Sequence, residues 1–122
     1  SGHKNFCGRI GTVGQRSGNF TLQNADVILF LGTRNNIRQA SYNWENFAKN
    51  AYKIVVDIDK AELDKPTVVP DLKINADLRE FLPALNESFP HLEIKNGLSF
   101  LKTFMVNTHL TTQKNTNLKM EL

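Results

Sequence analysis

Two continuous apolar runs constrain the fold of this chain more than any other feature. Residues 27–31 read VILFL, and residues 52–59 read YKIVVDID. An apolar run of this length without polar alternation is typical of a strand buried on both faces, as in parallel sheets that helices cover. We therefore expect an α/β fold with a Rossmann-like open parallel sheet of about three strands and flanking helices.

Two helices are expected beside the first run. Residues 15–25 suit a short helix that leads into it. Residues 41–51 place aromatic residues and alanines at helical spacing, with Ser41 as N-cap. We expect Trp44 and Phe47 of this second helix to lie in the core.

A third strand and a further helix are expected after the second run. Residues 72–75, LKIN, follow a loop that contains two prolines and can form a short strand. In residues 77–89, Asp77 and Glu80 have the spacing of an acidic capping box. Pro83 would cost about 3 kcal/mol in a helix interior, so we expect a kink or a restart there.

The domain organisation follows from these elements. A chain of 122 residues fits one domain, but three strands are few for an open α/β sheet. We therefore interpret residues 1–90 as part of a larger domain. Residues 91–122 are expected to form a helical linker and a polar, disordered tail without periodicity.

Composition and charge exclude several classes of function. The net charge is +3, yet residues 1–90 carry 11 lysines and arginines against 10 acidic residues. No basic stripe with interleaved aromatics is present, so nucleic acid is not an expected partner. No apolar run is long enough for a membrane span or a signal peptide, and Cys7 is the single cysteine. We expect a cytoplasmic protein without disulfides or membrane contact.

No catalytic or metal-binding constellation is apparent in the sequence. His3, His91 and His109 are scattered, and there is no nucleophile elbow. Cys7 is more typical of a small packing residue than of a nucleophile. We assign no catalytic residue and no metal ligand.

Four glycines occur close together in GRIGTVGQRSGN: Gly8, Gly11, Gly14 and Gly18. Their spacing differs from the dinucleotide fingerprint Gly-x-Gly-x-x-Gly, and no strand precedes them. Tight turns would explain them. A loop that offers backbone N–H groups to an anion at a helix N-terminus would explain them equally well.

Candidate binding residues follow the two apolar runs. Open α/β sheets bind ligands beyond the carboxyl ends of their strands, where Gly32, Arg34 and Arg38 would lie. Arg34 presents a planar fork suited to phosphate or carboxylate, or it pairs with an acidic residue at the domain edge. After the second run, we assign Asp57 to ligand contact and Asp59 to capping of the following helix.

These segments, taken in order, resemble a known family. The glycine-rich loop, ADVILFLGTR, KIVVDIDKAEL and NADLREFL together resemble the central domain of thiamine diphosphate-dependent enzymes, in particular the large subunit of acetolactate synthase (acetohydroxyacid synthase). The resemblance covers roughly residues 5–85. It implies a six-stranded Rossmann-like middle domain, of which this chain contains the second half.

The resemblance also implies a set of cofactor contacts. In acetohydroxyacid synthases this domain binds FAD in a non-redox role. The matching positions here are Gly11, Gly14, Gly32, Thr33, Arg34, Arg38, Asp57, Asp59 and Asp77. The family's Gly-Met-His-Gly and Arg-Phe-Asp-Asp-Arg appear here as GTVG and RNNIR, and Ala76 replaces a common glycine. Because related decarboxylases keep this domain without flavin, FAD binding stays open.

Catalysis in this family takes place in other domains. Thiamine diphosphate and Mg²⁺ are bound between a pyrimidine-binding and a diphosphate-binding domain, and these sequences are not among the 122 residues. The parent enzyme would decarboxylate a 2-oxo acid such as pyruvate and join the carbanion to a second carbonyl compound. We expect this chain to be non-catalytic and to form homo-oligomers. A stand-alone nucleotide-binding or self-associating module is the alternative.

Overall fold

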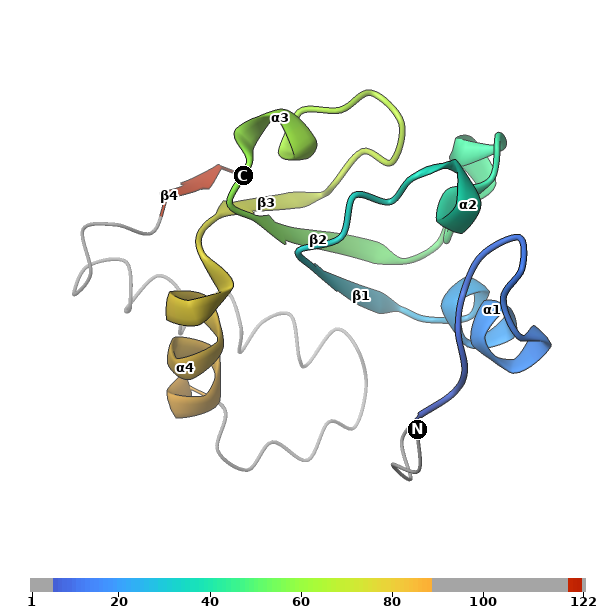
Figure 1. Cartoon of the computed structure of the whole chain (residues 1–122), viewed down its shortest axis with the longest axis horizontal. Helices are drawn as coiled ribbons and strands as arrows, with labels where there is room; N and C mark the ends of the chain where they lie inside the picture. Colours follow the sequence, from blue (N-terminus) through green and yellow to red (C-terminus); the bar gives the residue numbers. More distant parts are fainter. Residues whose placement is uncertain (1–5, 89–118, 122) are drawn as a thin grey trace.

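The computed structural model describes residues 6–88 and 119–121 (Figure 1). The strands are β1 (Val27–Leu31), β2 (Tyr52–Asp57), β3 (Leu72–Asn75) and β4 (Lys119–Glu121). The helices are α1 (Arg16–Gln23), α2 (Ile37–Ala40), α3 (Lys60–Leu63) and α4 (Leu78–Ser88), with a 3₁₀ helix η1 (Trp44–Asn46). The three predicted strands are confirmed as β1, β2 and β3. The helices predicted over residues 15–25 and 77–89 are confirmed as α1 and α4.

The strands form one sheet in the order β1-β2-β3-β4. β1, β2 and β3 are parallel, and β4 is antiparallel to β3. The parallel α/β fold is therefore confirmed. β4 belongs to the segment interpreted as linker and tail, whereas the helix expected within residues 91–107 lies outside the described residues. The domain boundary near residue 90 stays a prediction.

The core lies on both faces of the sheet, because neighbouring residues of a strand point to opposite faces. One face packs around Phe30, Phe47 and Val55, with the two phenylalanine rings stacked at a centroid distance of 6.1 Å. The other face packs around Ile54 and Ile74, which are fully buried. β2 therefore contributes to both faces, as its apolar run predicts.

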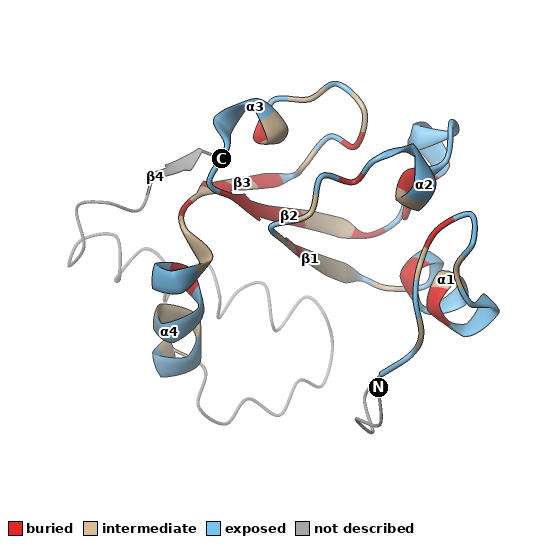
Figure 2. Cartoon of the chain, viewed as in Figure 1, coloured by how far each residue is buried: buried red, intermediate tan, exposed pale blue. Residues whose placement is uncertain are grey.

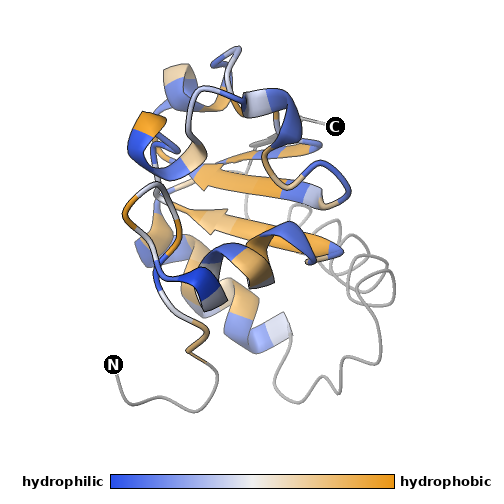
Figure 3. Ribbon diagram, turned by 90° about the vertical axis from the view of Figure 1, so that its right-hand side faces the viewer, coloured by the Kyte–Doolittle hydropathy of each residue, from blue (hydrophilic) through white to orange (hydrophobic). Residues whose placement is uncertain are grey.

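β1 and β2 differ in burial although both are apolar. The last four residues of β2 are buried, whereas Phe30 is the one fully buried residue of β1 (Figure 2). Along its other edge β1 has no pairing partner among the described residues. The prediction of two buried faces is thus confirmed for β2. β1, at the edge of the described sheet, also packs against the core on both faces, but four of its five residues are only partly buried. The strands of the sheet are mainly orange, the hydrophobic colour, in Figure 3.

The helix predicted over residues 41–51 is wrong. α2 begins earlier, where Asn36 Oδ1 accepts from the N–H of Arg38 at 3.0 Å, and it ends at Ser41, which has φ +61°. Ser41 is thus a C-cap and not an N-cap. Ala48 also has positive φ, at +46°, so no single α-helix can run through the predicted residues 41–51.

This break changes the burial of the aromatic residues in that segment. η1 is a single 3₁₀ turn of three residues, and it leaves Trp44 39% exposed. Phe47 is buried, so the core prediction is right for Phe47 and wrong for Trp44.

α4 begins where the capping pattern predicts. Asp77 Oδ1 accepts from the N–H of Arg79 at 2.8 Å, and the helix runs without a break through Pro83. The expected restart is therefore wrong. Both Pro83 and Arg79 are exposed, so water can reach the Arg79 carbonyl that the proline leaves without its usual donor. None of the described helices is long and apolar enough to cross a membrane.

Candidate ligand site at the carboxyl ends of the strands

The carboxyl ends of β1, β2 and β3 meet at one edge of the sheet. The N–H of Gly32 donates to the Val56 carbonyl at 2.9 Å. Asp57 is the register partner of Asn75, whose Nδ2 donates to the Asp57 carbonyl at 3.0 Å. The structure therefore brings together the predicted residues that follow each strand.

The aspartates at these strand ends each use a carboxylate oxygen to cap the local backbone. Asp57 Oδ1 accepts from the N–H of Asp59 at 2.9 Å, and Asp59 Oδ1 accepts from the N–H of Ala61 at 2.9 Å. Asp77 Oδ1 accepts from the N–H of Arg79 in the same manner. The capping role predicted for Asp59 is confirmed, and the cofactor contacts of all three aspartates stay predictions.

Asp77 also has a cationic partner. Arg79 Nη2 donates to Asp77 Oδ2 at 2.6 Å. The hydrogen bond from the Arg79 side chain, and next the one from its backbone N–H, lower the pKa of Asp77, while Asp77 raises the pKa of Arg79. A ligand that approaches Asp77 therefore meets a carboxylate already paired with a guanidinium.

Arg34 lies next to the acidic residue Glu62. Pairing with an acidic residue was the alternative to a ligand contact in the sequence analysis of Arg34. Its Nε is 3.8 Å from Glu62 Oε1, but its side chain is 76% exposed. Glu62 also pairs with Lys65, whose Nζ donates to the Arg34 carbonyl at 2.8 Å. An exposed pair at this distance contributes little to stability. The guanidinium therefore stays accessible, whereas the backbone of Arg34 is fixed.

Asn35 is a site residue that sequence reasoning missed. It is 8% exposed, has φ +43°, and its Oδ1 is buried without a hydrogen-bond partner among the described residues. A buried acceptor without a donor is costly, so a donor from water, a ligand or another polypeptide would be favourable there. The sequence signal was an asparagine directly after Gly32-Thr33-Arg34, since asparagine tolerates the left-handed region better than most residues.

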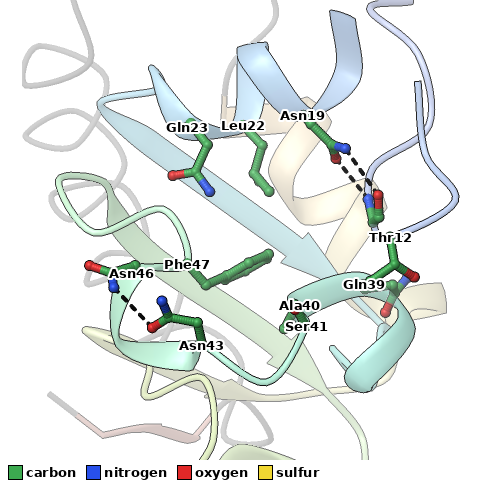
Figure 4. A pocket seen from close by; sticks show the side chains of 11 residues that line it. Thr12, Asn19, Leu22, Gln23, Gln39, Ala40, Ser41, Asn43, Asn46 and Phe47 are labelled. Atoms are coloured by element: carbon green, nitrogen blue, oxygen red, sulfur yellow. Dashed lines mark hydrogen bonds between the residues drawn. The ribbon is translucent and has the colours of Figure 1, made fainter. Parts of the chain in front are cut away.

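The glycine-rich loop contacts the segment around Arg38. The N–H of Thr12 donates to the Arg38 carbonyl at 2.8 Å, and a Cβ on Gly11 would lie 2.3 Å from that oxygen. Gly11 also exchanges two hydrogen bonds with the Asn19 amide, at 2.8 and 2.9 Å (Figure 4). Gly11 is thus required by a close backbone approach.

The other bonds of this loop are also internal. The N–H of Gly14 donates to the Gly11 carbonyl, the N–H of Gln15 donates to the Arg9 carbonyl, and the N–H of Arg9 donates to Gln15 Oε1. A Cβ on Gly14 would lie 2.6 Å from the Arg9 carbonyl oxygen. Because these N–H groups already have acceptors, the geometry favours tight turns over an anion-binding loop.

Thr33 links the two groups of predicted residues. Its Oγ1 donates to Gln39 Oε1 at 3.2 Å, and Gln39 follows Arg38 in α2. Figure 4 shows the arrowhead of β1 directed toward Thr12 and Gln39, so the glycine-rich loop and α2 lie at the carboxyl end of β1. Within residues 6–88 and 119–121, no group of three or more His, Cys, Asp or Glu side chains could bind a metal ion.

Comparisons with known proteins bear on this arrangement. Residues 1–85 match the family model described as thiamine pyrophosphate enzyme, central domain. The large subunit of acetolactate synthase isozyme 1 from Escherichia coli (strain K12) is 42% identical over 83 residues. The large subunit of isozyme 3 from the same organism is 34% identical over 85 residues. These alignments cover 68% and 70% of this chain but 14% of each relative.

Proposed function

Because this chain belongs to the thiamine pyrophosphate enzyme central-domain family, we propose that it forms the second half of the central domain of an acetolactate synthase-like enzyme. The complete enzyme would decarboxylate a 2-oxo acid such as pyruvate and join the resulting carbanion to a second carbonyl compound. In this proposal it is an oligomeric cytoplasmic enzyme. Its pyrimidine-binding and diphosphate-binding domains are the partners of this chain.

The observation that carries the proposal is the edge of β1. Its residues are all apolar, yet four of the five are half-buried and its second edge has no partner among the described residues. An apolar strand with an open edge is prone to unwanted pairing, so proteins normally cover it. A further parallel strand from the same domain would provide that cover.

The residues of this chain do not fit the catalytic cofactors of such an enzyme. The described residues offer no acidic cluster for Mg²⁺, and a diphosphate would lack the free N–H groups it needs at the glycine-rich loop. In the proposal, thiamine diphosphate and Mg²⁺ bind to the other domains, where the cofactor supplies the carbanion chemistry. This chain contributes structure and no catalytic residue.

FAD would contact the carboxyl edge of this sheet. The exposed Arg34 and the buried acceptor of Asn35 are compatible with a nucleotide there. The glycine-rich loop is not, because the N–H groups of Gly11, Thr12 and Gly14 have internal acceptors. We therefore assign no step to a flavin.

A chimera tests the proposed role. Residues 6–88 would replace the matched segment in the large subunit of Escherichia coli acetolactate synthase isozyme 1. We expect a folded chimera that forms acetolactate from pyruvate. A chimera that also carries Gly11→Ala should lose both folding and activity, because the Cβ meets a backbone oxygen. A folded but inactive chimera would contradict the proposal.

The isolated chain provides the complementary test. With pyruvate, thiamine diphosphate and Mg²⁺ it should form no acetolactate, since none of its described residues is suited to bind the catalytic cofactors. Formation of acetolactate by the 122-residue chain alone would show that the non-catalytic role is wrong.

Asn35 favours a second candidate function, a stand-alone nucleotide-binding module. Its buried Oδ1 could accept from a ribose hydroxyl or a base amino group, and the accessible Arg34 could contact the phosphate. This candidate predicts heat on calorimetric titration with ADP, FAD or NAD, and loss of binding on Arg34→Ala. Absence of heat with all three nucleotides would remove it.

A further inference from the structure

A pocket of about 420 Å³ lies between α1, the glycine-rich loop at Gly11 and the segment from α2 to η1. This volume falls in the range of roughly 300–1,000 Å³ that is usual for small-molecule sites. Five of its side chains are carboxamides: Asn19, Gln23, Gln39, Asn43 and Asn46. Leu22 and Phe47 form its apolar part, and Figure 4 shows Leu22 and Gln23 pointing from α1 toward Phe47.

The pocket contains no charged residue. Its remaining lining residues are glycine, alanine, serine and threonine, so none of the 11 side chains is acidic, basic or histidine. Gln23, Asn43 and Asn46 are exposed, so a ligand there stays in contact with water. A charged ligand group would find no counter-ion in this lining, whereas a neutral polar group needs none. The lining therefore selects for an uncharged ligand.

Part of the hydrogen-bonding capacity of these carboxamides is already used. Both amide atoms of Asn19 bond to the backbone of Gly11. Asn46 Nδ2 donates to Asn43 Oδ1 at 2.9 Å. Gln39 Oε1 accepts from Thr33.

The unused groups include both donors and acceptors. Within residues 6–88, the Gln23 side chain, Asn43 Nδ2 and Asn46 Oδ1 make no hydrogen bond with another side chain or with the backbone. Asn43 offers a donor, Asn46 an acceptor, and Gln23 both. An amide group in a ligand carries the complementary pair, a carbonyl acceptor and an N–H donor, in one plane.

We propose that this pocket binds a small, uncharged ligand that carries an amide group next to an apolar or aromatic body. The amide pairs with Gln23, Asn43 and Asn46, and the apolar body contacts Leu22 and Phe47. This inference goes beyond the proposed function and does not depend on it, because none of the five residues assigned to the ligand is among the predicted cofactor contacts.

Three nearly isosteric probes test the chemistry: benzamide is neutral, benzoate is an anion, and benzamidine is a cation at pH 7. Each is titrated into the ¹⁵N-labelled 122-residue chain, and the side-chain NH₂ signals are followed by NMR. We expect benzamide to shift the signals of Gln23, Asn43 and Asn46. It should bind at least about tenfold more tightly than either charged probe.

A pair of variants with the same change in charge tests the location. Gln23→Glu places a carboxylate in the pocket, so benzamidine should become the preferred probe. Asn50→Asp makes the same neutral-to-acidic change at an exposed residue outside the pocket, and benzamide should remain preferred. The backbone spectrum of each variant reports whether it is folded.

Several outcomes would overturn the proposal. They are equal affinity for the three probes, absence of shifts up to the solubility limit of benzamide, and shifts that map to residues outside the pocket. A Gln23→Glu variant that is folded and keeps the preference for benzamide would also overturn it. The probe series with the unmodified chain decides the matter even if a variant does not fold.

Discussion

The glycine-rich loop and the turns at the carboxyl ends of the strands are neighbours, yet they are built differently. In the loop, the tightest contacts join backbone to backbone, although the side chains of Gln15 and Asn19 also bond to it. Thr12 donates to the Arg38 carbonyl, and Gly11 lies against the same oxygen. In the strand-end turns, side chains contact backbone: Asp57, Asp59 and Asp77 each accept from an N–H two residues further along.

This difference indicates which residues tolerate substitution and which groups are accessible to a ligand. A loop in which backbones touch has no room for a Cβ and few free N–H groups, so its glycines are explained by packing. In a turn capped by a side chain, substitution of the capping residue removes only the capping hydrogen bond. The remaining side-chain atoms of such a turn stay available to a ligand. The count of glycines was therefore a poor guide to ligand contact in this chain.

The largest expected effect comes from Gly11→Ala. The new Cβ would lie 2.3 Å from the Arg38 carbonyl oxygen, and Gly11 has φ +114°. Strain and overpacking together should lower the free energy of unfolding by about 3–5 kcal/mol. Urea denaturation followed by circular dichroism measures the loss.

Gly32→Ala is the matched control. Its φ of +55° is a left-handed value, and its Cβ would meet only the flexible end of Leu78 at 2.9 Å. The expected loss is about 1–2 kcal/mol. Equal losses at Gly11 and Gly32 would contradict the distinction between the loop and the strand-end turns.

Most of the fold could be predicted from the sequence because its signals are local. The apolar runs predicted β1 and β2, and the Asp59 and Asp77 caps marked the starts of α3 and α4. The segment 41–51 could not be predicted, because positive φ at Ser41 and Ala48 interrupts a helix whose side-chain spacing is intact.

The candidate site was predictable only in part. The meeting of Gly32 and Asp57 follows from the common direction of parallel strands. The burial of Asn35 and the contact between Gly11 and Arg38 depend on tertiary packing, since Gly11 and Arg38 are far apart in the sequence. No local pattern encodes such contacts, so the closure of the glycine-rich loop emerged only from the structure.

The second prediction concerns a strand-end cap. Asp59→Ala removes the acceptor of the Ala61 N–H at the start of α3 and should cost about 1 kcal/mol. Asp59→Asn keeps a capping oxygen and should restore most of that stability. The midpoint of urea unfolding distinguishes the two variants. If the asparagine variant is as unstable as the alanine variant, capping is not the role of Asp59 in folding.

The third prediction has the opposite sign. Asn35→Gly removes a buried acceptor without a partner at a residue with φ +43°, which glycine adopts without strain. The greater freedom of glycine in the unfolded chain offsets part of the gain, so we expect stabilisation by about 0.5 kcal/mol.

The neighbouring asparagine provides the control for this substitution. Asn36 caps α2 by accepting from the N–H of Arg38. Asn36→Gly should therefore lower the free energy of unfolding by about 0.5 kcal/mol or less. Thermal unfolding of both variants gives the signs. Destabilisation by Asn35→Gly would indicate that the buried Oδ1 has a donor in the folded chain.

The last and smallest expected effect is the dependence of stability on pH. Charge is a second difference between the glycine-rich loop and the strand-end turns. The strand-end turns contain carboxylates, whereas residues 8–15 of the glycine-rich loop contain none. The Arg79 side chain lowers the pKa of Asp77 from its ordinary value of 3.8. A group with a lowered pKa in the folded state stabilises the fold above its unfolded pKa, and this contribution is lost as the pH falls through the folded value. Stability should therefore decrease below about pH 4.

Replacing the cation tests this dependence directly. Arg79→Gln removes the partner of Asp77, so the decrease in urea midpoint between pH 5 and pH 2.5 should become shallower, as it should in high salt. Arg16→Gln is the control, because it removes the same charge from an exposed arginine in α1 that is not a partner of Asp77. Because Arg79 is 89% exposed, solvent screens the pair and the change in slope should be small. An equal change in both variants would mean that net charge, and not the Asp77–Arg79 pair, determines the acid sensitivity of the strand-end turns.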